Sequence, residues 1–165
     1  MFQVTEGFDD FARKHASDKE NRVRLAKETK AEWEILKGLV SQFALDGKGI
    51  GSRNFEWVKT LSGRPMLVLG NVAAVLTDDG DKGGVPQNIQ VRFTRKPAGS
   101  GQVYIDNSPL DEKAWDLEPE VVKDEFVWFV LARAGRYSAA ALAEEIAKKL
   151  AQYHIEYEKA FGREA

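Results

Sequence analysis

Residues 66–77 constrain the fold more than any other part of the sequence. The segment is apolar at both odd and even positions, and Gly70–Asn71 is its one interruption. A strand with one face in water alternates apolar and polar residues, whereas a strand that is apolar at both odd and even positions is covered on both faces. The segment therefore predicts a central strand of a sheet, with a bulge at the glycine.

Weaker strand signals lie on both sides of this segment. Residues 55–60 and 89–94 show the two-residue period of half-buried strands, and residues 102–107 form a further short strand-like run. The loops between these runs have the length of hairpin connections, so the sequence predicts an antiparallel meander of four to five strands over residues 54–107. Residues 119–135 fit either a strand or a helix, and a strand over 125–132 is slightly favoured.

Helical patterns occupy both ends of the chain. Apolar residues recur at helical spacing over residues 8–44, where polar residues at Ser17–Asp18 suggest a break, so the sequence predicts one helix or a helix pair. A second helix begins after the capping residue Ser138 and runs to about Phe161. Ser108 and Pro109 begin a short helix that is expected to reach Trp115.

Together these patterns predict an α+β fold in one domain, residues 1–165. Residues 1–46 are expected to be helical, residues 54–107 to form the antiparallel sheet, and residues 108–165 to be a mixed segment ending in a long helix packed on that sheet. A chain of 165 residues buries about two thirds of its unfolded surface, so it needs neither metal nor disulfide to fold.

Composition excludes several kinds of chemistry. The chain has no cysteine, which excludes disulfides, thiol nucleophiles and cysteine-ligated metals, and it has only two histidines. Its 24 basic residues against 26 acidic ones argue against nucleic-acid binding, although a positive patch on the fold would favour it. The residues that would build such a patch are Lys48, Arg53, Arg92, Arg95 and Lys96.

No apolar run approaches the roughly 20 residues of a membrane helix. The first residues lack the pattern of a signal peptide, so the expected location is cytoplasmic, without a membrane partner. Asp79, Asp81 and Gly84 begin like a calcium-binding loop, but the glutamate required at its twelfth position is replaced by Gln90. The sequence therefore predicts no metal and no cofactor.

Two groups of residues are candidate binding sites. A small anionic ligand is expected at the start of the last helix, where backbone N–H groups and two guanidinium groups come together, or at the histidine–glutamate pair further along it. These ligand-binding candidates are Arg133, Arg136, Tyr137, Ser138, His154 and Glu158. An ion pair between these arginines and acids of residues 111–125 is the alternative explanation.

The second group is expected to contact protein partners. It joins an acidic stretch around a tryptophan to the aromatic end of the last helix, through which a homodimer is expected. These partner-binding candidates are Asp111, Glu112, Trp115, Asp116, Tyr153, Tyr157 and Phe161.

Taken together, the sequence does not establish a function. No catalytic motif is recognisable, so the favoured hypothesis is a non-enzymatic binding or accessory protein that acts through protein–protein contacts. The alternative is a protein or enzyme that binds a small anionic molecule between the sheet and the last helix. A deep pocket lined by converging polar groups would favour the alternative.

Overall fold

The computed structural model describes residues 7–60, 63–95 and 114–161, and the side chain of Phe161 is also outside the described part. There are two long helices in the described chain: α1 (Phe8–Leu45) precedes all the strands in the sequence, and α2 (Ala139–Phe161) follows them. The strands and the one 3-10 helix between them are β1 (Gly49–Ile50), β2 (Arg53–Asn54), β3 (Glu56–Lys59), β4 (Pro65–Leu69), β5 (Val72–Thr77), β6 (Asp81–Lys82), β7 (Val85–Pro86), β8 (Gln90–Arg95), β9 (Trp115–Val122), β10 (Glu125–Val130), η1 (Leu131–Arg133) and β11 (Gly135–Tyr137).

Seven strands form an antiparallel sheet in the order β11-β10-β9-β8-β5-β4-β3. The α+β class is therefore confirmed, but the described sheet is larger than the four to five strands expected. The extra strands are β9 and β11, on either side of β10, and one of the two strands formed by residues 66–77. The strand expected over 125–132 is confirmed as β10. The β1–β2 and β6–β7 pairs form separate small hairpins.

Residues 66–77 form two strands, so the prediction of one bulged strand was wrong. Leu69 pairs directly with Val72, and Gly70 and Asn71 form the two-residue turn between β4 and β5. Gly70 has a φ of 60°, which suits glycine at the first central position of such a turn. The central position is confirmed, because nearly every residue of both strands is buried.

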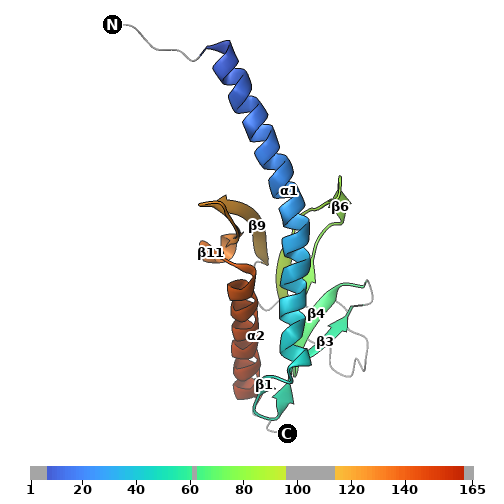
Figure 1. Ribbon diagram of the computed structural model, residues 1–165. Helices are drawn as coiled ribbons and strands as arrows, with labels where there is room; N and C mark the ends of the chain where they lie inside the picture. The colour runs from blue at the N-terminus through green and yellow to red at the C-terminus, as the bar shows by residue number, and fades with distance from the viewer. Residues whose placement is uncertain (1–6, 61–62, 96–113, 162–165) are drawn as a thin grey trace, which may run out of the picture.

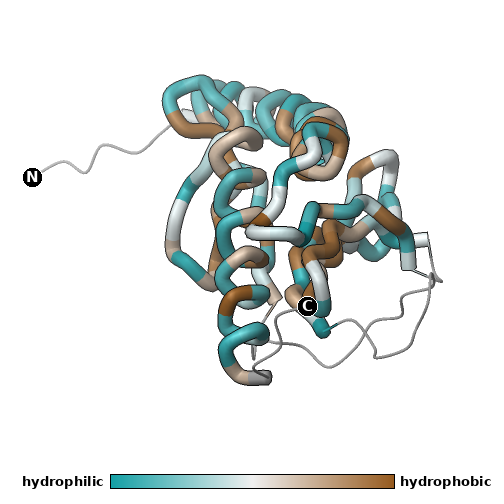
Figure 2. The backbone as a smooth tube through the Cα atoms, turned by 90° about the horizontal axis from the view of Figure 1, so that it is seen from below, coloured by the Kyte–Doolittle hydropathy of each residue, from teal (hydrophilic) through white to brown (hydrophobic). Residues whose placement is uncertain are grey.

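Both helices pack side by side against the same face of the sheet (Figure 1). The hydrophobic residues concentrate between these layers (Figure 2). Trp33 of α1 meets Trp128 of β10 in this core, with ring centroids 6.3 Å apart. The opposite face of β4 and β5 is also buried, through a smaller cluster of Met66, Val68, Ala73 and Val75.

Helix α1 is one helix, and the break expected at Ser17–Asp18 does not occur. It ends where the sequence predicts, because Asp46 caps it and Gly47 follows with a φ of 67°. Only the second half of α1 packs on the sheet. Residues 8–24, here called the arm, are all exposed and extend beyond the rest of the molecule (Figure 1).

The predicted cap of the last helix is also confirmed, since the Ser138 hydroxyl accepts a hydrogen bond from the Ala141 N–H at 3.1 Å. The strand expected over 102–107 and most of the short helix expected from Ser108 lie outside the described residues; Trp115 itself begins β9. Among the described helices, none has the length and hydrophobicity to cross a membrane.

Candidate functional site

A cavity lies between the start of β9, the η1 turn and α2, and we call it the α2 cavity. Its volume is about 750 Å³, within the range of small-molecule pockets. Glu145, Lys148, Lys149 and Gln152 line it from one face of α2, because their spacing repeats with the helical turn. The remaining lining residues are Ala114, Trp115, Asp116, Leu131, Ala132 and Arg133.

Arg133 is the most firmly held cation of the α2 cavity. It ends the η1 turn, and the chain then turns away through Ala134, which has a left-handed conformation. The guanidinium lies over the Trp115 ring, 5.1 Å from its centroid, and Nη2 donates to Glu145 Oε1 at 3.0 Å. A guanidinium fixed by stacking and by one carboxylate keeps further N–H donors for another acceptor.

Glu145 lies between two cations. Lys148 Nζ is 2.6 Å from Glu145 Oε2, while Arg133 contacts the other carboxylate oxygen. The hydrogen bond from Lys148 lowers the pKa of Glu145 below its ordinary value; the charges of Lys148 and Arg133 act in the same direction, and burial opposes them. The same contact raises the pKa of Lys148. Glu145 is therefore ionised at neutral pH and is the counterion of both Arg133 and Lys148.

The remaining polar groups leave the lining with a positive balance. Lys149 Nζ lies 4.8 Å from the Tyr153 ring centroid and forms no salt bridge with a carboxylate of the described residues. Asp116 accepts a hydrogen bond from Gln90 at 2.6 Å. Three cations, Arg133, Lys148 and Lys149, therefore face two carboxylates, and the lining carries a net charge of +1.

The structure separates the two arginines that the sequence analysis grouped. Arg136, on β11, pairs with Glu120 of β9 at 2.7 Å and stacks on Phe129, so the ion-pair explanation is confirmed for it. Its position is on the edge strand of the sheet, and it is not part of the α2 cavity lining. Tyr137 packs against the core and Ser138 caps α2. Of the candidates at the helix start, Arg133 alone lines this cavity.

His154 and Glu158 lie at the other end of α2. His154 is 4% exposed, and its Nε2 is 3.9 Å from Glu158 Oε1, beyond hydrogen-bond distance. Its ring packs closely on Gly70 in the β4–β5 turn. Both residues line a smaller cavity of about 220 Å³ beside the β1–β2 hairpin. Within the part of the chain that the structure describes, no cluster of three or more potential metal ligands occurs.

The partner-binding candidates are mostly not on a common free surface. Trp115 is 4% exposed and forms an edge-to-face contact with Phe93. Tyr153 and Tyr157 are half-buried against the same core. Asp111, Glu112 and the side chain of Phe161 lie outside the described residues. Contact with a protein partner, including a homodimer through α2, stays a prediction.

The sequence analysis missed the α2 residues of the cavity. None of Glu145, Lys148, Lys149 and Gln152 was among the candidate binding residues predicted from the sequence. The repeating spacing of Glu145, Lys148, Lys149 and Gln152 was a usable signal for one polar face. What the sequence does not contain is the position of Arg133 and Trp115 opposite that face.

The fold and cavity thus define an α+β protein with two helices on one face of a seven-stranded antiparallel sheet and a cation-rich cavity beside the second helix. Comparison with known proteins adds no further identity: no protein-family model matches the chain, and no curated protein or solved structure is significantly similar to it.

Proposed function

We propose that this protein is a non-enzymatic binding protein that holds a small anionic molecule in the α2 cavity. The observation that carries the proposal is the position of Arg133, which stacks on Trp115 and lines a cavity of about 750 Å³ together with two lysines. Preorganised guanidinium donors next to lysine ammonium groups suit carboxylate or phosphate oxygens. An anion that entered would compete with Glu145 for these donors and could also reach Lys149.

Binding is favoured over catalysis by the chemistry of the lining. The described lining contains no serine, threonine, tyrosine or histidine, and its carboxylates already accept hydrogen bonds from Gln90 and from Lys148. Docking of a protein on the acidic stretch, which the sequence favoured over an anionic ligand, receives less support because Trp115 is buried beneath Arg133.

The test compares two arginines in similar settings. Arg133 and Arg136 each stack on an aromatic ring and pair with a glutamate, but only Arg133 lines the cavity. Inorganic phosphate, pyrophosphate and citrate are the probes, and the measurements are calorimetric titration and the shift in melting temperature. We expect Arg133→Ala to weaken binding by roughly tenfold or more, and Arg136→Ala to leave it unchanged.

Two outcomes would contradict the proposal. One is that none of the three anions binds or stabilises the wild-type protein at millimolar concentration. The other is that both arginine variants lose affinity equally, because binding would then depend on general surface charge. Repeating the titrations at two salt concentrations separates this second case, since binding to general surface charge weakens more steeply with salt.

A further inference from the structure

The arm is a helix without tertiary packing in the described structure. All of residues 8–24 are exposed, and the arm is about 25 Å long. Most of the stability of a helix in a protein comes from packing of one of its faces, and nothing in the described structure packs on the arm. A partner that covered one face of the arm would therefore stabilise its helical state.

The face that packs on the sheet continues along the arm. Thr29, Trp33, Leu36 and Val40 are the buried residues of α1, and they repeat at intervals of four and three. The helical period of 3.6 residues, continued toward the N-terminus, selects a stripe of exposed and half-buried residues. This stripe consists of Leu25, Arg22, Asp18, His15, Phe11 and Phe8.

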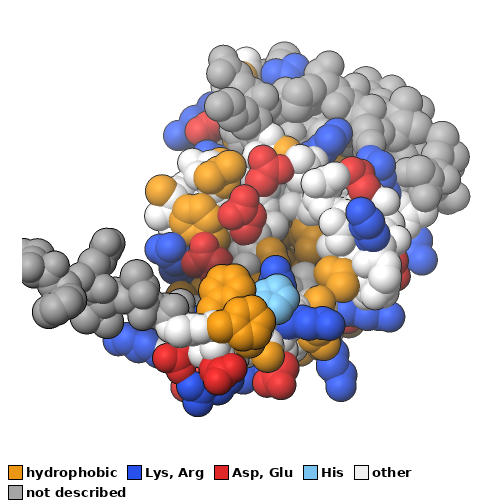
Figure 3. All heavy atoms as spheres, turned by 90° about the horizontal axis from the view of Figure 1, so that it is seen from above, with side chains coloured by type: hydrophobic (Ala, Val, Ile, Leu, Met, Phe, Trp, Pro, Cys, Tyr) orange, Lys and Arg blue, Asp and Glu red, His pale blue; other side chains and the backbone are white. Residues whose placement is uncertain are grey.

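The outer end of the stripe is apolar. Phe8 is 79% exposed and Phe11 is 60% exposed, which is unusual for two large aromatic side chains on neighbouring turns of a helix. Viewed from above, hydrophobic side chains gather beside a histidine on the surface of the molecule (Figure 3). Charged side chains surround this group, which is the arrangement of a small interface with an apolar centre.

We propose that two copies of this chain associate through their arms, side by side and antiparallel. A two-fold axis near the middle of the arm places Phe8 opposite the partner's Leu25. It also places Phe11 opposite the partner's Arg22, which suits a cation–π contact. At the centre, His15 faces the partner's Asp18. Each contact occurs twice, so every layer of the stripe receives a chemically complementary neighbour.

The charges favour this direction over the parallel one. Parallel arms in register would place Asp18 against Asp18 and Arg22 against Arg22, and like charges that face each other across an interface oppose association. The antiparallel arrangement replaces both repulsive layers with an imidazole–carboxylate layer and an aromatic–guanidinium layer. Charge complementarity therefore selects a second copy of the chain, in one orientation, as the occupant of the stripe.

The length of the arm fits the same arrangement. Helix α1 meets the rest of the molecule at Thr29, about one turn beyond the end of the arm. A partner helix whose Phe8 reaches Leu25 would therefore end beside that junction. A cavity of about 490 Å³ lies at this junction under Thr29 and is partly lined by Val85, Pro86 and Ile89. Its apolar residues give the end of the partner's arm a surface to pack against.

The first test is the oligomeric state by sedimentation equilibrium from about 1 to about 500 µM. An interface made from two short helical stripes belongs to the smallest class, so we expect a dissociation constant on the order of tens of micromolar. Phe8→Ala combined with Phe11→Ala should abolish the dimer. Val23→Ala is the matched control, because Val23 is 62% exposed but lies off the stripe. A monomer at every concentration, or an unchanged dimer in the double variant, would overturn the proposal.

The second test fixes the orientation. The chain has no cysteine, so Phe8→Cys and Leu25→Cys each introduce a single thiol. When the two variants are mixed and oxidised, antiparallel arms should give the mixed disulfide between positions 8 and 25. Predominant disulfides between two copies of Phe8→Cys would show parallel arms and contradict the proposal. Both variants should retain the wild-type melting temperature, because the changed side chains lie outside the core.

Discussion

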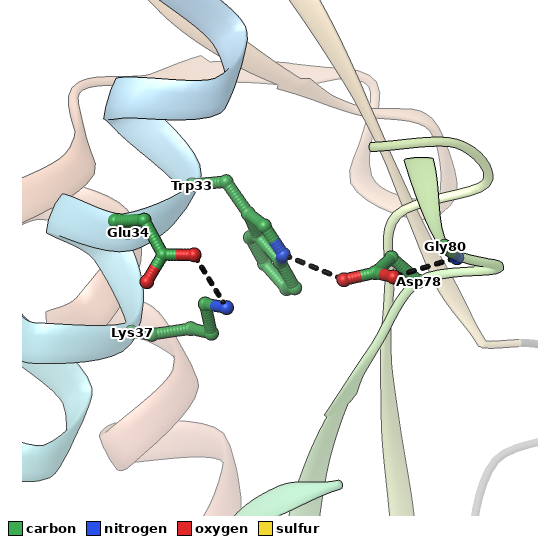
Figure 4. A network of polar contacts seen from close by, with 5 residues as sticks. All are labelled: Trp33, Glu34, Lys37, Asp78 and Gly80. Carbon is green, nitrogen blue, oxygen red and sulfur yellow. Dashed lines mark hydrogen bonds and ion pairs between the residues drawn. The ribbon is translucent and has the colours of Figure 1, made fainter. Parts of the chain in front are cut away.

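At the scale of single residues, one carboxylate connects α1 to the sheet. The Trp33 indole Nε1 donates to Asp78 Oδ2 at 2.9 Å, and Asp78 Oδ1 accepts from the Gly80 N–H at 2.8 Å (Figure 4). Lys37 lies over the same indole, 5.1 Å from its centroid, and pairs with Glu34 at 2.9 Å. Asp78 therefore satisfies a buried donor and shapes the chain as it leaves β5.

Asp78→Ala should destabilise the fold by about 1–3 kcal/mol, because the buried Trp33 N–H would lose its acceptor. Urea unfolding followed by tryptophan fluorescence measures this loss. Asp79→Ala is the control, since the exposed Asp79 side chain accepts its hydrogen bond from Asn88, which is not part of α1. Equal losses in the two variants would show that the contact with Trp33 contributes nothing specific.

Glu145 gives the protein a pH dependence with a defined sign. The hydrogen bond from Lys148 lowers its pKa in the folded state below the ordinary value of 4.5. A carboxylate of this kind stabilises the fold above that ordinary value, and the contribution is lost as the pH falls through the folded-state pKa. Glu145→Gln should therefore reduce the fall in melting temperature between about pH 7 and about pH 3.5, by a small amount because Lys148 is exposed.

The same variant tests the proposed ligand site. Without the Glu145 charge, Arg133 and Lys148 lose their internal counterion, so the affinity for phosphate or citrate at pH 7 should rise several-fold. Glu156→Gln is the control, because Glu156 is exposed on α2 and is not part of the cavity lining. A weaker affinity in Glu145→Gln would contradict competition between Glu145 and the ligand.

At the scale of elements, the β4–β5 turn is packed directly against α2. A Cβ atom added to Gly70 would lie 2.8 Å from the His154 imidazole, and the φ of 60° is already unfavourable for other residues. The His154 side chain is itself buried, with 4% exposure. The β4–β5 turn can therefore approach the end of α2 this closely only because residue 70 is a glycine.

Gly70→Ala should destabilise the protein by roughly 2–4 kcal/mol, through the positive φ and through overpacking against His154. Gly83→Ala is the matched control, because its φ of 63° is almost the same but nothing lies within 4 Å of an added Cβ. The difference between the two losses, measured by thermal unfolding, isolates the contact with His154. Equal losses would show that the backbone conformation accounts for the whole effect.

The elements differ in how well the sequence predicted them. Residues 139–161 were predicted well because a capping serine and an amphipathic stripe agree with each other. In residues 66–77 the buried environment was predicted correctly and the turn was missed, since the apolar character of both strands concealed the change of direction. Ser17–Asp18 shows the opposite error, because polar residues continue a helix readily once they are exposed.

At the scale of the whole molecule, the candidate cavity depends on contacts that the sequence does not encode locally. Arg133 was identified from the sequence, but with Arg136 as its companion and the N-terminus of α2 as its site. The sheet places the two side chains apart, one over Trp115 and the other over Phe129. Strand order and register determined this outcome, and neither can be read from the spacing of residues in the chain.

The two halves of helix α1 differ in their resistance to unfolding, because the arm is exposed and the second half is packed in the core. Unwinding from Phe8 meets only exposed or half-buried side chains until Thr29, which is buried and whose hydroxyl donates to the Leu25 carbonyl at 2.6 Å. Further unwinding would remove Trp33 from the core, where it contacts Trp128 and Asp78. Thr29 thus marks the boundary between local fraying, which costs little free energy, and cooperative unfolding of the whole protein.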